Sequence, residues 1–198
     1  MREKSNRIAR FIFNNDLNEE KIELYGFAIY IVISSLLHIG TLLVIGYLFG
    51  MVVESVIFYV SFIAIRKFAG GYHARTPLKC YFFSIVTIII ALFLLKIIKI
   101  FPIENVNCFF CILSVISLVI ICILSPLDNE NKNIDCKDKI ILKKISILNT
   151  TGFLIFFFLI MGIEKTYALA IALGLCVSSI VLLMREIQII KNTFIKLQ

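Results

Sequence analysis

Tryptophan is absent from the 198-residue sequence, proline occurs only three times, and charged residues make up only 17% of the chain. An average soluble domain has about a quarter of its residues charged and about half of them apolar. In this sequence 60% of the residues are hydrophobic. So little charge and so large an apolar fraction argue against a soluble domain and predict a protein that lies in a membrane.

The six cysteines do not have the arrangement of a disulfide-rich secreted protein. Four lie in apolar runs, namely Cys108, Cys111, Cys122 and Cys176. The other two, Cys80 and Cys136, lie in polar segments. Membrane-embedded thiols usually serve as small apolar side chains. Cys108 and Cys111 have the spacing of a zinc or redox pair, but no second pair and no histidine accompany them. We therefore expect neither a metal site nor a cofactor.

Basic residues give the sequence a net charge of +7. They lie between apolar runs rather than in one stripe with aromatic residues, so nucleic acid is not an expected partner. Residues 1–26 are polar with both signs of charge, which predicts no cleavable signal peptide. Ile8, Phe11 and Ile12 recur there with helical spacing among basic residues. We expect an amphipathic interfacial segment over residues 1–26 that contacts membrane lipid.

Six apolar runs follow this segment and predict an all-α, polytopic membrane protein with about six transmembrane helices. The runs cover residues 27–49, 51–65, 81–101, 106–124, 145–163 and 166–184. One crossing of the hydrocarbon core needs about 20 residues, so the run at 51–65 is short. Lys and Arg in short loops stay on the cytoplasmic side. Six crossings with cytoplasmic termini leave only Lys96, Lys99 and Lys165 outside, whereas five crossings would not give this partition.

The predicted crossings define a single membrane-embedded domain over residues 1–198. Both termini and the segments 66–80 and 126–144 are expected on the cytoplasmic side of the cell membrane. The segment at 126–144 carries charges of both signs. We interpret it as a solvated connector, although its Asp128 could orient a catalytic histidine.

The polar segment between the second and third runs holds both a histidine and a cysteine, His73 and Cys80. Thr76 followed by Pro77 predicts the start of a helix, because Thr caps a helix N-terminus and Pro suits the first helical position. Cys80 would then lie in the first turn. Unpaired backbone N–H groups and the neighbouring basic residues favour a thiolate there.

His73 lies seven residues before Cys80, and one continuous helix would separate the two by about 10.5 Å. Gly70, Gly71 and Pro77 argue against a continuous helix, so the chain can fold back and bring the imidazole toward the sulfur. The pattern alone fits either a Cys/His catalytic dyad or two unrelated residues at the membrane surface.

The spacing of Arg66, Gly71, His73 and Cys80 resembles the signature of the accessory gene regulator B (AgrB) family, membrane-embedded cysteine endopeptidases of bacterial quorum sensing. The resemblance extends to the amphipathic N-terminus, the placement of the apolar runs and the length of the chain. It implies that Cys80 is the nucleophile and His73 its general base. Arg66 and Gly71 match positions that the family needs for activity.

The resemblance further implies that the substrate is a short precursor peptide of the accessory gene regulator D type. Cys80 would release the acidic C-terminal tail through a thioester, and the remaining signal sequence would close into a thiolactone or lactone ring. The resemblance also implies a homodimer. Basic residues of the second cytoplasmic loop serve in the family, and Lys143 and Lys144 are candidates for that role here.

Two other functions are compatible with the sequence when the family resemblance is left aside. A small membrane carrier or exporter without covalent catalysis would not need Cys80. It would use the polar residues within the predicted spans: His38, Glu54, Lys96 and Lys99. A membrane scaffold would need neither His73 nor Cys80.

Overall fold

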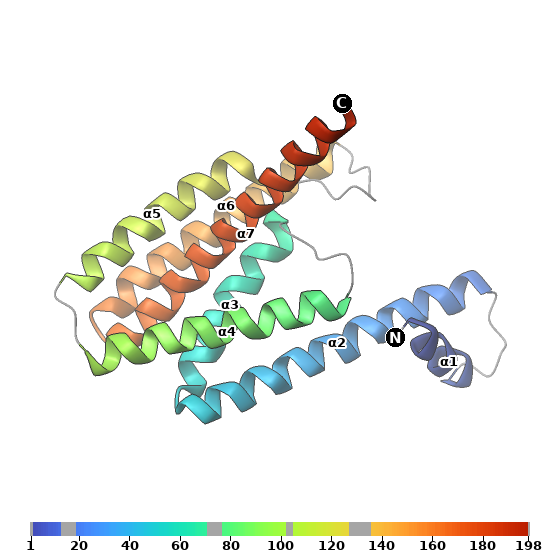
Figure 1. Cartoon of the computed structure of the whole chain (residues 1–198), viewed down its shortest axis with the longest axis horizontal. Helices are drawn as coiled ribbons and strands as arrows, with labels where there is room; N and C mark the ends of the chain where they lie inside the picture. The colour runs from blue at the N-terminus through green and yellow to red at the C-terminus, as the bar shows by residue number, and fades with distance from the viewer. Residues whose placement is uncertain (1, 13–18, 71–76, 102–104, 127–135, 198) are drawn as a thin grey trace. The chain divides into compact units, whose positions relative to one another are not determined.

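The computed structural model describes residues 2–12, 19–70, 77–101, 105–126 and 136–197 of the chain. Every secondary-structure element in these ranges is an α-helix, which confirms the predicted all-α class (Figure 1). The helices, in chain order, are α1 (Arg2–Ile12), α2 (Glu19–Phe49), α3 (Val52–Ala69), α4 (Pro77–Ile100), α5 (Val106–Leu124), α6 (Cys136–Met161) and α7 (Lys165–Leu197). They form two compact units, Met1–Val44 and Ile45–Gln198, and α2 contributes to both.

The first unit, Met1–Val44, contains α1 and most of α2. The surface of α1 carries large apolar side chains beside basic ones: Phe11 is 87% exposed, and Ile8 and Arg10 are also exposed. Arg10 Nη2 lies 3.3 Å from Glu19 Oε1, an ion pair that joins α1 to the first turn of α2. An interfacial position in the headgroup region of a membrane, expected for residues 1–26, stays a prediction.

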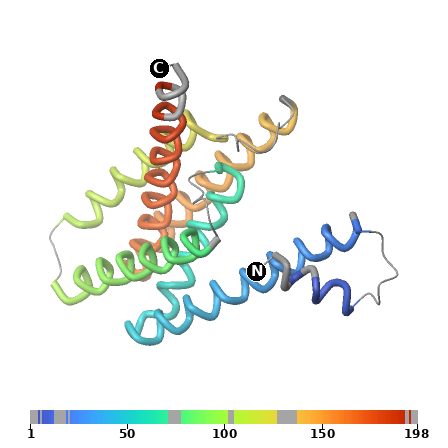
Figure 2. Tube along the Cα trace, turned by 45° about the vertical axis from the view of Figure 1, so that its right-hand side comes forward, coloured from blue at the N-terminus to red at the C-terminus, as the bar shows by residue number. Residues whose placement is uncertain are grey.

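In the second unit, Ile45–Gln198, α7 is the central helix. It packs against α3, α5 and α6 and, over a shorter stretch, against α4 (Figure 2). In its apolar part 72% of the residues are buried, compared with 17% to 28% in α4, α5 and α6. One cluster of buried apolar side chains joins α7 to α3 and α5: Leu175, Leu182, Ile65, Ala69 and Ile121.

Helices α3 and α7 run parallel and in close contact. A methyl group on Gly174 of α7 would lie 3.1 Å from the Phe58 carbonyl oxygen and would collide with the Ser61 side chain. Four residues further along both helices, the Ser178 hydroxyl donates to the Phe62 carbonyl at 3.4 Å. Small residues at such a contact let two helix backbones approach, which is how helices associate where lipid supplies no hydrophobic drive.

Helices α3 and α4 run antiparallel. At one end of the pair, Glu54 near the start of α3 lies 3.7 Å from Lys99 near the end of α4. At the other end, Arg66 in the last turn of α3 contacts Cys80 in the first turns of α4. We name these two regions the Glu54 end and the Cys80 end of the helix pair.

Five helices are long and apolar enough to cross a membrane, so the chain is a polytopic membrane protein. They are α2, α4, α5, α6 and α7, and the described residues therefore hold five candidate spans rather than the six predicted. The remaining long helix, α3, has 18 residues and carries Glu54, Arg66 and Lys67. A crossing by residues 51–65 stays a prediction. The packing of α3 along α4 and α7, which are both candidate spans, favours such a crossing.

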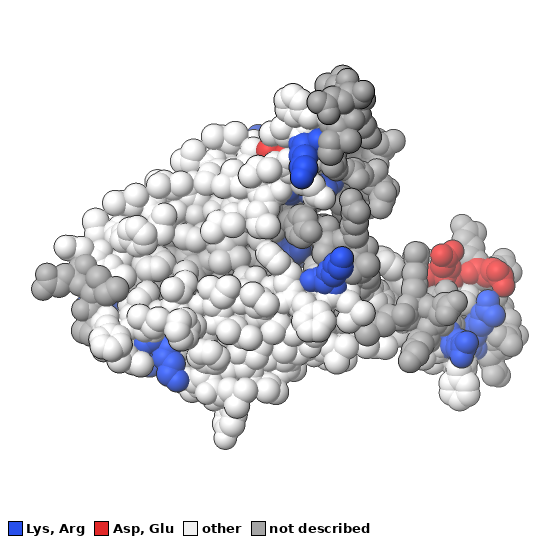
Figure 3. Space-filling view, viewed as in Figure 1, with Lys and Arg blue, Asp and Glu red and all other residues white. Residues whose placement is uncertain are grey.

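Charge is unevenly distributed over the second unit. Figure 3 shows a broad face without charged side chains and Lys and Arg side chains near the ends of the helices. An uncharged band between charged ends is the pattern that a lipid bilayer requires. The cytoplasmic position of the termini and of the polar segments stays a prediction.

Candidate active site

The candidate site forms where α3 ends and α4 begins. Helix α3 ends at Ala69, and Gly70 follows with a φ of 82°, a conformation that glycine adopts without strain. The Gly70 N–H donates to the Arg66 carbonyl at 3.1 Å and closes the last turn. Helix α4 begins at Pro77, as predicted, because proline lacks the N–H group that a first helical turn leaves unpaired.

Arg66 and Cys80 meet across this junction. Arg66 Nη2 donates to Cys80 Sγ at 3.7 Å, and both side chains are half-buried. Cys80 is the fourth residue of α4, so its sulfur also lies near the positive end of the helix dipole. A guanidinium donor and a helix N-terminus therefore both lie beside the sulfur.

The Arg66 guanidinium packs on an aromatic ring. Its Cζ lies 5.5 Å from the centroid of the Phe62 ring, one turn earlier on α3, which is a cation–π distance. Phe62 is 4% exposed, and the Phe58 ring stacks on it with the centroids 6.1 Å apart. The sequence pattern does not single out Phe62, although its spacing of four residues from Arg66 on one helix is a signal that could identify it.

Two neighbouring helices hold this part of α3 in place. The Ser178 hydroxyl of α7 donates to the Phe62 carbonyl, and Asn149 Nδ2 of α6 donates to the Ala64 carbonyl, both at 3.4 Å. The two carbonyls belong to residues within four positions of Arg66. The position of the guanidinium therefore depends on α6 and α7 as well as on α3.

Of the four residues that carry the family resemblance, the structure describes Arg66 and Cys80 and brings them together. His73 and Gly71 lie outside the described residues, and so does Asp128. The Cys/His dyad therefore stays a prediction.

Lys143 and Lys144 lie on a helix rather than in a loop. Helix α6 already begins at Cys136, so the segment predicted as a connector at 126–144 is shorter in the structure. Asp138 lies in the first turn of α6, where an acidic side chain interacts favourably with the helix dipole. This favourable charge helps to explain why the helix starts before the apolar run.

The two lysines lie toward the Cys80 end of the bundle. Helix α6 is antiparallel to α7, to which a short turn joins it, and α7 is parallel to α3 (Figure 1). Asn149 lies beside Ala64, and Lys144 is five residues nearer the start of α6, which corresponds to about 7.5 Å along the helix. Lys143 and Lys144 therefore lie at about the level of the last turn of α3 or beyond it.

The charged residues that a carrier pathway would use contact structural partners. Glu54 has a side chain that is only 8% exposed, and its Oε1 lies 3.7 Å from Lys99 Nζ. Lys96 Nζ lies 5.6 Å from the centroid of the Phe49 ring. Sequence reasoning missed the pairing of Glu54 with Lys99, because the two residues are far apart in the chain and only the folded helix pair brings them together.

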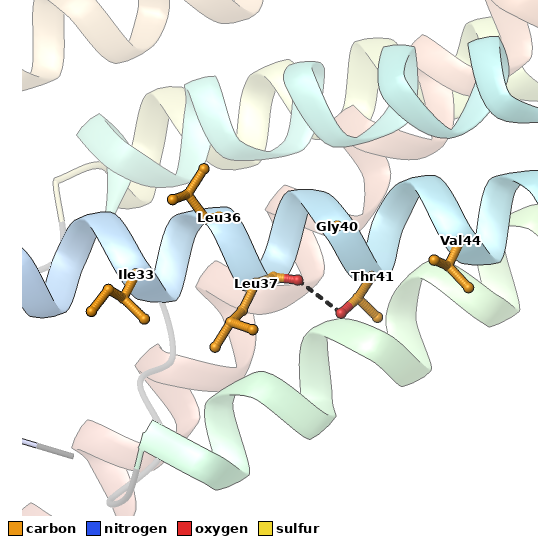
Figure 4. Close-up of a pocket in the computed structure, with 6 residues that line it drawn as sticks. All are labelled: Ile33, Leu36, Leu37, Gly40, Thr41 and Val44. Carbon is orange, nitrogen blue, oxygen red and sulfur yellow. Dashed lines mark hydrogen bonds between the residues drawn. The ribbon is translucent and has the colours of Figure 1, made fainter.

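A shallow apolar groove runs along α2 within the first unit. Figure 4 shows the residues that line it: Ile33, Leu36, Leu37, Gly40, Thr41 and Val44. The Thr41 hydroxyl donates to the Leu37 carbonyl at 2.8 Å, and His38 Nδ1 lies 2.7 Å from the Ser34 carbonyl oxygen. These contacts are local to one helix. The groove holds neither a cysteine nor a charged residue, so we do not assign it to the candidate site.

A family model described as AgrB, accessory gene regulator B, matches residues 5–183 of the chain. The matched range includes both sides of the α3–α4 junction and the two lysines of α6. Comparisons with curated proteins and with solved structures gave no significant match. Because the family match covers most of the sequence, the chain belongs to the accessory gene regulator B family and has a role in the peptide processing of accessory gene regulator quorum sensing.

Proposed function

We propose that this chain is a membrane cysteine endopeptidase that cuts the C-terminal tail from a short precursor peptide and promotes cyclisation of the remainder. The observation that carries the proposal is the contact between Arg66 Nη2 and Cys80 Sγ at the start of α4. A thiol becomes a strong nucleophile where a nearby cation and a helix N-terminus favour its thiolate form. Family membership supplies the class of substrate.

His73 is the general base of the proposed site. It lies among the six residues between Gly70 and Pro77. Arg66 and Cys80, on the helices that flank this segment, are in contact. Gly71 precedes His73 by two residues in the sequence, and glycine is the residue with the greatest backbone freedom. An imidazole within hydrogen-bond reach of the sulfur would form the dyad that cysteine peptidases need.

The first chemical step is attack of the Cys80 sulfur on the carbonyl carbon at the junction of signal and tail. The tetrahedral intermediate collapses, the C–N bond breaks, and the tail leaves as an amine that receives one proton. The signal sequence remains attached to Cys80 as a thioester.

Cyclisation follows from the chemistry of that thioester. A thiol inside the bound peptide can take over the acyl group at little energetic cost, because one thioester replaces another. An internal serine would give a lactone instead. A peptide held with its nucleophile against the acyl carbonyl, away from bulk water, would cyclise faster than it hydrolyses.

The proposed partners are an accessory gene regulator D type precursor, membrane lipid and a second copy of this chain in a homodimer. Lys143 and Lys144 are proposed to attract the acidic tail of the precursor, since both lie toward the Cys80 end. Attraction between exposed charges of this kind weakens with salt.

The direct test is co-expression of the chain with its precursor in membranes, followed by measurement of tail release. We expect Cys80→Ala and His73→Ala to insert normally and to release no tail. Cys108→Ala is the matched control, because Cys108 is an exposed thiol on α5 outside the candidate site, and this variant should release tail at the wild-type rate.

Cleavage by the Cys80→Ala variant at the wild-type rate would end the endopeptidase proposal. A carrier function would then become the better explanation, and Glu54→Gln together with Lys99→Gln would be the variants to test for peptide movement.

A further inference from the structure

We infer that Arg66 maintains Cys80 as a thiolate before any substrate binds, and that Phe62 positions Arg66 for this role. The inference rests on the proposed function and assigns separate roles to Arg66 and His73. A permanent cation stabilises the charge on the sulfur, which leaves His73 to transfer protons.

The contact itself is the first argument. Arg66 Nη2 donates to Cys80 Sγ at 3.7 Å, and both side chains are half-buried. A guanidinium stays protonated across the physiological pH range. Its attraction for a negative sulfur is much less screened at a half-buried site than in bulk water. Charge-assisted hydrogen bonds are also stronger than neutral ones, so the contact favours the thiolate over the thiol.

The support beneath the guanidinium is the second argument. The Phe62 ring lies 5.5 Å from Arg66 Cζ, is itself almost fully buried, and stacks on the fully buried Phe58. An arginine that packs on a fixed ring loses little further freedom when it contacts the sulfur. Ser178 and Asn149 bond to carbonyls of the same stretch of α3 and resist its displacement.

A resting thiolate changes the proton transfers that His73 performs. The sulfur attacks with its own electron pair, so no proton has to leave Cys80 at that stage. When the C–N bond breaks, a protonated His73 gives its proton to the departing amine. When the internal thiol of the peptide attacks the thioester, the neutral His73 accepts that thiol's proton. Cys80 leaves again as a thiolate, which Arg66 stabilises, and the cycle is closed.

The test measures alkylation of Cys80 in membranes without any peptide. Iodoacetamide is neutral and reacts with the thiolate, and mass spectrometry of the fragment that contains Cys80 gives the rate. We expect Arg66→Gln to slow the reaction about tenfold or more, because a charge contact at a half-buried site is lost. Arg66→Lys, which keeps the charge, should stay clearly faster than Arg66→Gln.

Two further variants isolate the parts of the arrangement. Lys67→Gln is the matched control, because Lys67 is the next residue on α3 but is exposed and packs on the Phe68 ring, and its rate should equal the wild-type rate. Phe62→Leu keeps the charge and removes the ring, so we expect a slowing of about threefold. His73→Ala should be alkylated within about threefold of the wild-type rate, since Arg66 remains.

Three results would overturn the inference. The first is alkylation of Arg66→Gln at the wild-type rate. The second is an equal loss in Arg66→Gln and Arg66→Lys, which would indicate a role for the shape of arginine rather than for its charge. The third is a His73→Ala variant that is as slow as Arg66→Gln. Because no peptide is present, none of these results depends on whether the chain cleaves a precursor.

Discussion

At each end of the α3–α4 pair a cationic side chain contacts a residue of the other helix, and the contact distance is the same although the contacted group differs. At the Glu54 end, Lys99 Nζ lies 3.7 Å from a carboxylate oxygen, and at the Cys80 end Arg66 Nη2 lies 3.7 Å from a sulfur. A carboxylate and an ammonium neutralise each other and leave no reactive group. A thiol beside a cation instead becomes a nucleophile. Under the proposed function, a cation contact of similar length therefore serves packing at one end of the helix pair and catalysis at the other.

The two cations also differ in how firmly they are placed. The Lys99 side chain is 55% exposed and reaches the buried Glu54 from the surface. The Arg66 guanidinium packs on the buried Phe62 ring, which in turn stacks on the Phe58 ring. Long exposed side chains lose conformational entropy when they pair, whereas a supported guanidinium loses less. We therefore expect precise placement to matter more at the Cys80 end.

Reversal of the charge at the Cys80 end should have the largest effect. Arg66→Glu places a carboxylate beside the sulfur, so we expect tail release to fall at least about 100-fold, which corresponds to about 2.7 kcal/mol. The assay is tail release in membranes at equal protein levels. Lys99→Gln changes a cation at the other end and should keep release within about threefold of the wild type. Equal losses in the two variants would remove the distinction between the two ends.

Disruption of the α3–α7 contact, at a level between the Glu54 end and the Cys80 end, should have the second largest effect. Gly174→Val would collide with Ser61, so we expect a loss of about 2.5 kcal/mol in the free energy of unfolding, measured in mild detergent. Gly152→Ala is the control, since a methyl group there has no other side chain or helix within 4 Å. Its stability should change by less than about 1 kcal/mol. A stable, active Gly174→Val variant would show that α3 does not need this close approach.

Loss of one partner at the Glu54 end should have a moderate effect on stability alone. Lys99→Gln leaves the buried Glu54 without its ammonium partner, at a cost of about 2 kcal/mol, which is less than for a fully buried pair because Lys99 is half-exposed. Thermal unfolding in detergent measures it. Addition of Glu54→Gln should recover most of the loss. The prediction fails if the double variant is less stable than Lys99→Gln.

The smallest effect is expected where α6 contacts α3. Asn149→Leu removes the hydrogen bond to the Ala64 carbonyl, which is long at 3.4 Å, so we expect a loss of about 1 kcal/mol or less in the free energy of unfolding. A fall of about twofold in Cys80 alkylation should accompany it, because α6 helps to place the stretch of α3 before Arg66. A tenfold fall in alkylation would instead make Asn149 as important to the sulfur as Arg66.

Local signals predicted the helix that carries Cys80. The pair Thr76-Pro77 predicts a helix start, and α4 begins at Pro77 with Cys80 near its N-terminus. The apolar run at 106–124 coincides with α5, because polar residues and Pro126 bound it. Signals of this kind act within a few residues of the chain, so periodicity and capping are enough to find them.

Long-range contacts could not be predicted from the same patterns. The place of α3 beside α7 depends on Gly174 and Ser178, which no local pattern connects to Ser61 or Phe62. Likewise, the resemblance selects Arg66 as important but does not indicate that its guanidinium contacts the sulfur. The early start of α6 also differs from the prediction, because hydropathy marks the apolar run and not the charged turns that precede it.

The most direct test of the central claim is to trap the acyl-enzyme. A precursor whose internal nucleophile is replaced by alanine cannot cyclise, so the signal sequence should accumulate on Cys80 after the tail has left. We expect intact mass analysis of the chain to show an adduct of the mass of the signal sequence, localised to Cys80 and removed by hydroxylamine. Release of the tail at the normal rate by the Cys80→Ala variant, with the same precursor and no adduct on the chain, would contradict the account.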